Sequence, residues 1–237
     1  MYTFTTDEFE ELKTLRWYKD TNGAWNESGI NNPLNIGYAI EYIAECKPEK
    51  YEEWESYFYE KMANKEKILE FSKIFKETIL KDKALMYRFD YASLEEKEFC
   101  KMVECRLIYE TWLGYFAEKE SCRLLLELLA KDGYKATVKH MTPQEDNKYA
   151  VDFLLCDGET PVCGLQIKPD TYRKSTLYAV QEAIKMNNKK NTMFIEKYRI
   201  PVEYVYYKKT EPYVYRLVNN GVLKNVESLL YNQAYPF

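Results

Sequence analysis

The stretch YAVDFLLCDGETPVCGLQIKPDTY, residues 149–172, decides the fold of this chain. Its two apolar runs, 149–156 and 162–168, have the length and composition of buried strands. Asp157-Gly158 lies between them and is typical of a tight turn, so the two strands are expected to pair as a hairpin. Pro169 cannot donate to a strand ladder and is expected to end the second strand. The C-terminal half should therefore contain a sheet built on this hairpin.

The sequence on either side of this hairpin predicts the rest of the sheet. Further strands are expected over 134–141, 202–207 and 213–217, and helices over 176–199 and 223–230. The expected order is helix, three strands, helix, strands. This order indicates an α/β or α+β fold with a mixed sheet.

Residues 1–133 show almost only helical periodicity. Thr6-Asp7 is typical of a helix cap, and Asn and Gly make 21–32 an expected loop. Helices are expected over four segments: 6–15, 33–44, 48–62 and 65–81.

The last helical segments lead into the sheet region. Ser93 and Glu96 have the spacing of a capping box before a long helix, which Gly114 is expected to bend or break. A final helix over 118–132 should end at Gly133. We therefore expect a helical region over 1–116 and a sheet-containing core over 117–237, or one continuous domain.

Composition narrows the functional classes. The chain has 237 residues, of which 46% are hydrophobic and 30% charged, enough for a sizeable core. It has no apolar run of membrane-spanning length and no secretory signal at its N-terminus. Six cysteines without a Cys-x-x-Cys pair favour a reducing compartment, which predicts a cytoplasmic protein. The single histidine, His140, excludes most zinc enzymes and multi-histidine iron sites.

The net charge of −4 conceals an asymmetry along the chain. Residues 41–60 hold seven acids and two bases, whereas residues 168–209 hold ten bases and four acids. A basic C-terminal half is suited to phosphates, and a solvated helix face explains the same charges equally well.

The hairpin also carries the candidate chemistry. Gln166 and Lys168 are alternate residues and should project from one face of their strand, with Asp152 on the partner strand. A buried carboxylate needs a compensating partner, and a divalent ion supplies one. Mg²⁺ prefers oxygen ligands, here the Asp152 carboxylate and the Ile167 carbonyl, and Lys168 would orient the attacking water. Polar residues of an ordinary edge strand are the alternative interpretation of this set.

The order of elements resembles the PD-(D/E)xK nucleases, whose core runs helix, three strands, helix, strand. Gln166 stands where that superfamily usually has an acid, which leaves one negative ligand fewer and the number of metals open. The helix before the first strand often supplies a further carboxylate. Glu120 is the candidate for that role, with Glu118 and Glu127 on the same helix as alternatives.

A closer resemblance is to the MjaI-type restriction endonucleases. It rests on YEEWE at 51–55, on YETWLGY at 109–115 with Glu120, and above all on QIKPDTY at 166–172. The resemblance implies a Mg²⁺-dependent type II restriction endonuclease that cuts double-stranded DNA at a short specific site, acts as a homodimer and has no membrane partner. Asp152, Gln166, Lys168 and Glu120 would form the catalytic site, with Asp152, Glu120 and Ile167 binding the metal. The phosphate contacts would come from five bases: Arg173, Lys174, Lys185, Lys189 and Lys190.

Under the same resemblance, the helical region would serve recognition or dimerisation. Two other functions remain open. The chain is alternatively a catalytically inactive helical protein that interacts with DNA or protein, as the acidic N-terminal half suggests. It is alternatively a nuclease that acts on RNA or on damaged DNA.

Overall fold

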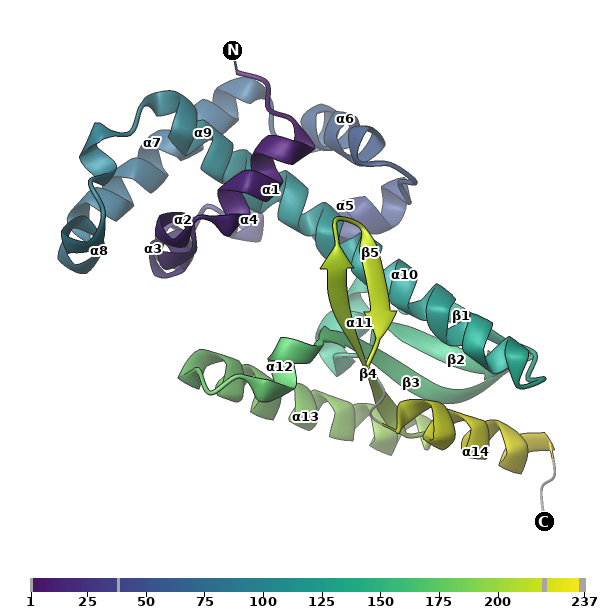
Figure 1. The fold of residues 1–237 in the computed structure, drawn as a ribbon. Helices are drawn as coiled ribbons and strands as arrows, with labels where there is room; N and C mark the ends of the chain where they lie inside the picture. The colour runs from purple at the N-terminus through teal and green to yellow at the C-terminus, as the bar shows by residue number, and fades with distance from the viewer. Residues whose placement is uncertain (1, 38, 219–220, 235–237) are drawn as a thin grey trace. The chain divides into compact units, whose positions relative to one another are not determined.

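The computed structural model describes residues 2–37, 39–218 and 221–234. The chain divides into two compact units, Met1–Gly114 and Tyr115–Phe237 (Figure 1). No described helix is both long and apolar enough to cross a membrane.

The first unit is helical. Its elements are α1 (Thr6–Thr14), α2 (Arg16–Asp20), α3 (Asn22–Ser28), α4 (Pro33–Ile36), α5 (Ala39–Cys46), α6 (Tyr51–Lys61), α7 (Lys65–Lys81), α8 (Lys83–Arg88), the 3₁₀ turn η1 (Tyr91–Ser93), α9 (Glu96–Glu104) and the π-helical turn η2 (Cys105–Tyr109). The helix α10 (Glu110–Lys131) begins here and continues into the second unit.

Aromatic side chains build the core of the first unit. Trp54, Phe58 and Phe9 are fully buried. Phe9 stacks on Tyr109 at 5.3 Å between ring centroids, and the Trp54 indole N–H donates to the Ile108 carbonyl at 3.1 Å. This bond satisfies a backbone oxygen within η2, where the wider turn disturbs the regular helical ladder.

Several helical expectations are confirmed and others are wrong. The helix over 65–81 is confirmed, with Asn64 as its cap. Residues 21–32 are not a loop, because α3 forms there and ends at Gly29 with φ of 65°. The helix expected over 33–44 is divided into α4 and α5, and Gly37 between them has φ of 73°. An L-residue with a side chain rarely adopts that conformation, so glycine suits the interruption.

Two predicted helix signals are also wrong. Glu95 precedes α9 without a side-chain cap, and the Ser93 hydroxyl donates to the Asp90 carbonyl, so no capping box forms. Gly114 neither bends nor breaks the chain, because α10 continues through it. The irregularity lies earlier, at η2. The expected end of α10 at Gly133 is confirmed, since Gly133 has φ of 89° directly after the last turn.

The second unit contains the sheet. Its elements after α10 are β1 (Ala136–His140), α11 (Pro143–Tyr149), β2 (Phe153–Asp157), β3 (Thr160–Pro169), α12 (Asp170–Lys174), α13 (Tyr178–Tyr198), β4 (Val202–Glu211), β5 (Val214–Leu217) and α14 (Val222–Ala234). In the described chain the strands form one sheet in the order β1-β2-β3-β4-β5. Among the strand pairs of the described residues, only β3–β4 is parallel, so the expected mixed sheet is confirmed.

Helices cover both faces of this sheet. Leu165 and Ile167 of β3 pack with Cys122, Leu125 and Leu129 of α10, and α14 completes that core. On the other face, Val151 packs with Phe194 of α13. Gly164 lies on this second face, where an added Cβ would come within 2.9 Å of Val151 and 3.0 Å of Phe194. Successive residues of β3 therefore face the two cores in turn, with Leu165 and Ile167 toward α10 and Gly164 toward α13.

The expected hairpin forms, with Phe153 paired to Leu165. The expected strand over 149–156 is partly wrong, because residues 143–149 form α11 and β2 begins only at Phe153. Thr142 and Glu145 make a capping box that starts α11, and Ala150, with φ of 53°, ends it. Asp152 thus lies just before its strand and not within it. This position leaves its side chain at the end of the hairpin.

Candidate active site

Asp152 is fixed by the backbone of β3. Its N–H donates to the Leu165 carbonyl at 2.9 Å, which continues the β2–β3 pairing by one residue. Its carboxylate Oδ2 accepts from the Ile167 N–H at 2.6 Å. The side chain is 6% exposed. β2 begins only after Asp152, so no β2 carbonyl is available to the Ile167 N–H of β3. The Asp152 carboxylate accepts from that N–H instead.

Lys168 faces the same carboxylate. Its Nζ lies 3.8 Å from Asp152 Oδ2, and its side chain is 22% exposed. Burial raises the pKa of Asp152, while the Lys168 charge and the Ile167 N–H lower it. A separation of 3.8 Å is an ion pair beyond direct hydrogen-bonding distance. The structure therefore brings together two of the residues that the sequence singled out.

Ile167 contributes its backbone to this site. The N–H and C=O of one strand residue point to the same edge, and its N–H bonds Asp152. The Ile167 carbonyl is therefore directed to the edge of β3 where Asp152 lies. Its side chain points into the opposite core with Leu165.

Glu118 is the helix carboxylate that faces Asp152. Its pKa is raised well above the ordinary range, first by loss of solvation and then by the Asp152 charge, with Lys168 opposing. The sequence already contains a pattern that favours Glu118 over Glu120 and Glu127. Glu118 shares the buried α10 stripe of Cys122, Leu125 and Leu129, at spacings of about one helical turn.

Glu120 is not brought to Asp152. Its two oxygens accept from Arg123 at 2.8 and 2.6 Å, and that hydrogen bonding lowers the Glu120 pKa. Glu127 also pairs with Arg123. Arg123, Glu120 and Glu127 thus form a network along another face of α10, whereas Glu118 lies on the stripe that meets the sheet.

Asp146 is a site residue that the sequence reasoning missed. Its pKa is raised to about 6, first by burial, then by the Asp152 charge and by a hydrogen bond between the two carboxyl groups, with the Lys168 charge opposing. The same bond lowers the pKa of Asp152, so Asp146 is the donor of this bond when the pair holds one proton. The sequence pattern that could have identified Asp146 is the Thr142–Glu145 capping box. It starts α11 and places Asp146 in the first turn of that helix.

Gln166 lies two residues before Lys168 on β3, so both project from one face of the strand, as expected. It is 1% exposed, and its amide lies 3.1 Å from that of Asn191 on α13. Asn191 is also 3.0 Å from the Tyr204 hydroxyl on β4. Gln166 therefore ties β3 to α13 beneath the site.

The residues present fit a divalent ion. Among the described residues, no group of three or more His, Cys, Asp or Glu forms a ready metal cage. Mg²⁺ does not need such a cage, because it binds through one or two carboxylates and retains several waters. Burial and mutual proximity raise the pKa values of Asp146 and Asp152, and a bound cation would favour the charged forms of both carboxyls.

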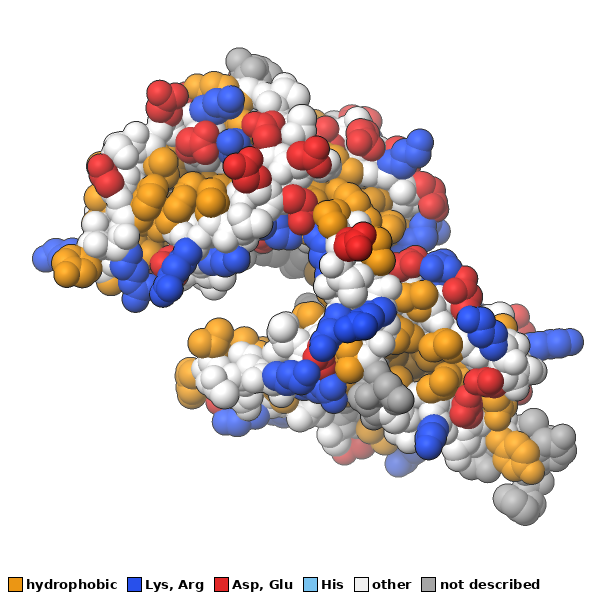
Figure 2. All heavy atoms as spheres, in the orientation of Figure 1, with side chains coloured by type: hydrophobic (Ala, Val, Ile, Leu, Met, Phe, Trp, Pro, Cys, Tyr) orange, Lys and Arg blue, Asp and Glu red, His pale blue; other side chains and the backbone are white. Residues whose placement is uncertain are grey.

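A second cluster begins two residues after Lys168. Asp170 is 3% exposed and accepts from the Arg173 Nε at 2.8 Å and from Lys174. Lys208 Nζ of β4 lies 3.6 Å from the same carboxylate. These contacts hold the Asp170 pKa at about 2, with the Lys174 hydrogen bond as the largest cause. Figure 2 shows Lys and Arg side chains gathered over α12 and the β4–β5 hairpin.

The other predicted bases lie along α13. Lys185 pairs with Glu182, Lys190 Nζ lies 3.5 Å from the Asn147 amide oxygen, and Lys189 is exposed. Lys190 also lowers the pKa of Asp146, which places it on the active-site side of α13. The structure thus separates an ordered group at α12 from the bases of α13.

A family model for the MjaI restriction endonucleases matches residues 21–219, most of the 237-residue chain. The chain matches no curated protein and no solved structure. The family match includes the Asp152 hairpin, Glu118 and the Asp170 cluster. The chain belongs to the MjaI restriction endonuclease family.

Proposed function

We propose that this family member is a Mg²⁺-dependent type II restriction endonuclease with a PD-(D/E)xK site, which hydrolyses phosphodiester bonds of double-stranded DNA at a short specific sequence. Family membership supports a nuclease that acts on DNA. The observation that carries the finer proposal is the meeting of Asp152, Lys168 and Glu118 at the end of the β2–β3 hairpin.

The metal would be held by oxygen atoms. We assign it to the Asp152 carboxylate and the Ile167 carbonyl, with Glu118 in the place first given to Glu120 and with Asp146 as a further acceptor. Bound Mg²⁺ would polarise the phosphodiester and lower the pKa of a bound water. Gln166 would position β3 without contacting the reacting atoms.

Lys168 would act on the attacking water and on the phosphate. Its ammonium lies beside Asp152 and would donate hydrogen bonds to a water or to a phosphate oxygen of bound DNA. As water attacks phosphorus and one P–O bond breaks, negative charge accumulates on the phosphate oxygens. A fixed cation stabilises that charge, which lowers the barrier.

The basic residues of α12 and α13 would hold the DNA backbone. Arg173, Lys174 and Lys208 are arranged around Asp170, and Lys185, Lys189 and Lys190 extend the set along α13. Phosphate contacts position a duplex but do not read its sequence. We assign recognition or dimerisation to the helical unit, and a homodimer suits the cutting of both strands of a palindrome. Six free cysteines fit a reducing cytoplasm.

Calorimetric titration with Mg²⁺ tests the proposed ligand set. Glu118→Gln keeps the size of the side chain but removes its charge, and it should weaken Mg²⁺ binding at least about tenfold. Glu120→Gln is the matched control on the same helix and should change the affinity less than about twofold. Equal effects, or a larger effect of Glu120→Gln, would show that the metal is not bound at the hairpin end as proposed.

A further inference from the structure

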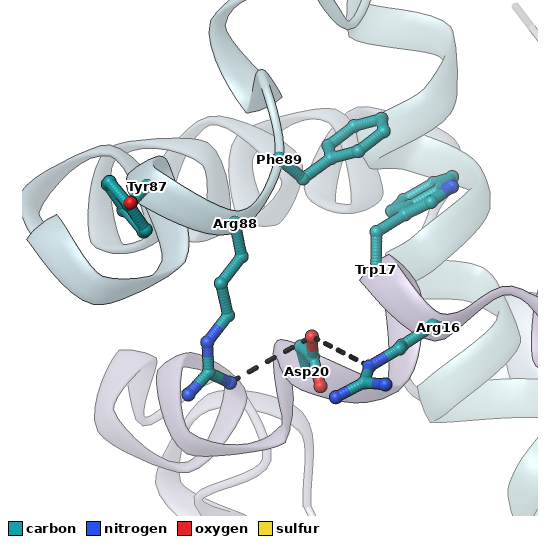
Figure 3. A pocket seen from close by; sticks show the side chains of 6 residues that line it. All are labelled: Arg16, Trp17, Asp20, Tyr87, Arg88 and Phe89. Atoms are coloured by element: carbon teal, nitrogen blue, oxygen red, sulfur yellow. Dashed lines mark ion pairs between the residues drawn. The ribbon is translucent and has the colours of Figure 1, made fainter.

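A pocket of about 510 Å³ lies within the helical unit, apart from the residues proposed for catalysis. It is lined by Arg16, Trp17, Asp20, Tyr87, Arg88 and Phe89. Figure 3 shows these side chains around an open space, with Tyr87 on one side, Trp17 and Phe89 on the other, and the charged groups along one edge. Pockets of this size are large enough for a small organic ligand.

The charged groups of this pocket are weakly engaged. Asp20 Oδ2 lies 3.9 Å from Arg16 Nε and 3.9 Å from Arg88 Nη1, beyond hydrogen-bonding distance. The Arg16 and Arg88 side chains are 91% and 58% exposed, and Asp20 is 21% exposed. Each guanidinium offers five N–H donors in a planar fork, and the carboxylate offers two acceptor oxygens. The edge therefore presents donors and acceptors together.

The aromatic groups form apolar walls. Trp17 and Phe89 stack at 5.0 Å with an interplanar angle of 13°. Tyr87 is 93% exposed, an unusual position for a large ring. Flat apolar walls next to polar edge groups match a planar aromatic ligand with hydrogen-bonding atoms on its rim.

A phosphate does not match this edge, because the Asp20 carboxylate between the two guanidinium groups would repel it. Guanine does match. Its O6 and N7 accept from arginine, and its N1–H and N2 amino groups donate to a carboxylate. Adenine lacks the N1–H, and thymine lacks adjacent acceptors. Cytosine has the adjacent acceptors O2 and N3, but its N4 amino group is its one donor group on that edge, whereas guanine offers both N1–H and N2 to a carboxylate. Lys and Arg side chains also gather over α2, α3 and α8 (Figure 2), which favours a ligand that belongs to an anionic strand.

We propose that this pocket binds a guanine base of the DNA that is out of its base pair. Pairing with cytosine would occupy the N1–H and N2 amino groups, so Asp20 could bind them only in an unpaired base. The inference rests on the proposed DNA substrate and adds a base-binding site to it.

Binding to labelled ten-residue thymidine oligonucleotides, with one central dG, dA or dC, tests the pocket. EDTA in the buffer prevents cutting, and fluorescence anisotropy measures affinity. The wild-type protein should bind the dG oligonucleotide at least about fivefold more tightly than the others. Replacing dG by inosine, which lacks the N2 amino group, should reduce this preference in the wild type but not in Asp20→Asn.

Substitution of both arginines by lysine, Arg16→Lys with Arg88→Lys, keeps the charge and removes the planar forks. It should reduce the dG preference to less than about twofold while the affinity for the other oligonucleotides stays unchanged. Arg216→Lys, an exposed arginine on β5, is the matched control and should retain the preference. An equal loss for every oligonucleotide would mean a phosphate contact and would overturn the proposal.

Two further results separate the pocket from the proposed nuclease activity. A wild-type protein that cuts phage DNA but shows no dG preference rejects the pocket and leaves the nuclease proposal standing. A dG preference in a protein that cuts no DNA supports the pocket and rejects the nuclease proposal. Free guanosine monophosphate that competes at the same affinity as the oligonucleotide would overturn the assignment to DNA.

Discussion

At the scale of single residues, the proposed active site contains three neighbouring carboxyl groups whose charged forms are disfavoured. Asp152, Asp146 and Glu118 all have raised pKa values, and burial is the largest cause for each. The sequence identified Asp152 and Lys168 because both lie on the hairpin. It missed Asp146, since the pairing of Asp146 with Asp152 depends on a helix that the apolar pattern of 149–156 concealed.

Asp146 should make the stability of the metal-free protein depend on pH. Its pKa is about 6 in the folded chain and 3.8 when unperturbed. Between these values the folded state keeps a proton that the unfolded state has lost, so the free energy of unfolding falls as pH rises from about 4 to 6. The loss persists above pH 6.

Asp146→Asn removes this effect. The free energy of unfolding of the variant, relative to that of the wild type, should increase by about 1 kcal/mol as the pH rises from 4 to 8. This value allows for solvent screening at a partly exposed group. Urea unfolding in EDTA at pH 4, 6 and 8 measures the difference, with the exposed Asp157→Asn as control. A constant difference across these pH values would show that the two carboxyls do not share a proton.

Substitution of Asp170 is a test in which charge and geometry predict opposite changes in DNA affinity. Asp170→Asn adds one unit of positive charge beside Arg173 and Lys174, and charge alone would therefore strengthen DNA binding. We expect weaker binding, about threefold or more, because the substitution releases the cations from their fixed positions. Anisotropy with a 30-base-pair duplex in EDTA measures this. Tighter binding by Asp170→Asn would contradict a positioning role.

At the scale of elements, the hydrophobic pattern correctly predicted the helices and strands that bury one apolar face. The hairpin, the helix α7 and the end of α10 follow from alternation, apolar stripes and a terminal glycine. The misplaced elements are those that local composition describes poorly. Asn and Gly at 22–28 suggested a loop because both residue types have low helix propensity. The burial of Ala24 and Trp25 nevertheless stabilises α3.

The contact between β3 and α13 gives a prediction at this scale. Gly164→Ala would force a methyl group against Val151 and Phe194 and should destabilise the protein by about 1–3 kcal/mol in urea. Gly114→Ala is the matched control, since an added Cβ there has no neighbour within 4 Å and the residue lies in a helix. It should be neutral or stabilising by up to about 1 kcal/mol. Equal destabilisation by both would contradict the close packing at Gly164.

At the scale of the whole molecule, the asymmetry of charge along the sequence has a structural counterpart. The acidic stretch 41–60 belongs to the helical unit, and the basic stretch 168–209 follows the active-site hairpin through α12, α13 and β4. This distribution agrees with the proposal that the second unit contacts the DNA phosphates. The sequence could not indicate the guanine pocket, because α2 and α8 meet only in the folded unit.

The central claim is that Asp152 and Lys168 form a metal-dependent site that cuts duplex DNA. The most direct measurement is digestion of phage DNA with Mg²⁺ by the wild type and by Lys168→Ala, with Arg216→Lys as control. The account predicts discrete fragments from the wild type and the control, and a loss of at least about 100-fold in cutting rate for Lys168→Ala, which should still fold and bind DNA. DNA left intact by the wild type, or cut equally well by Lys168→Ala, would contradict it.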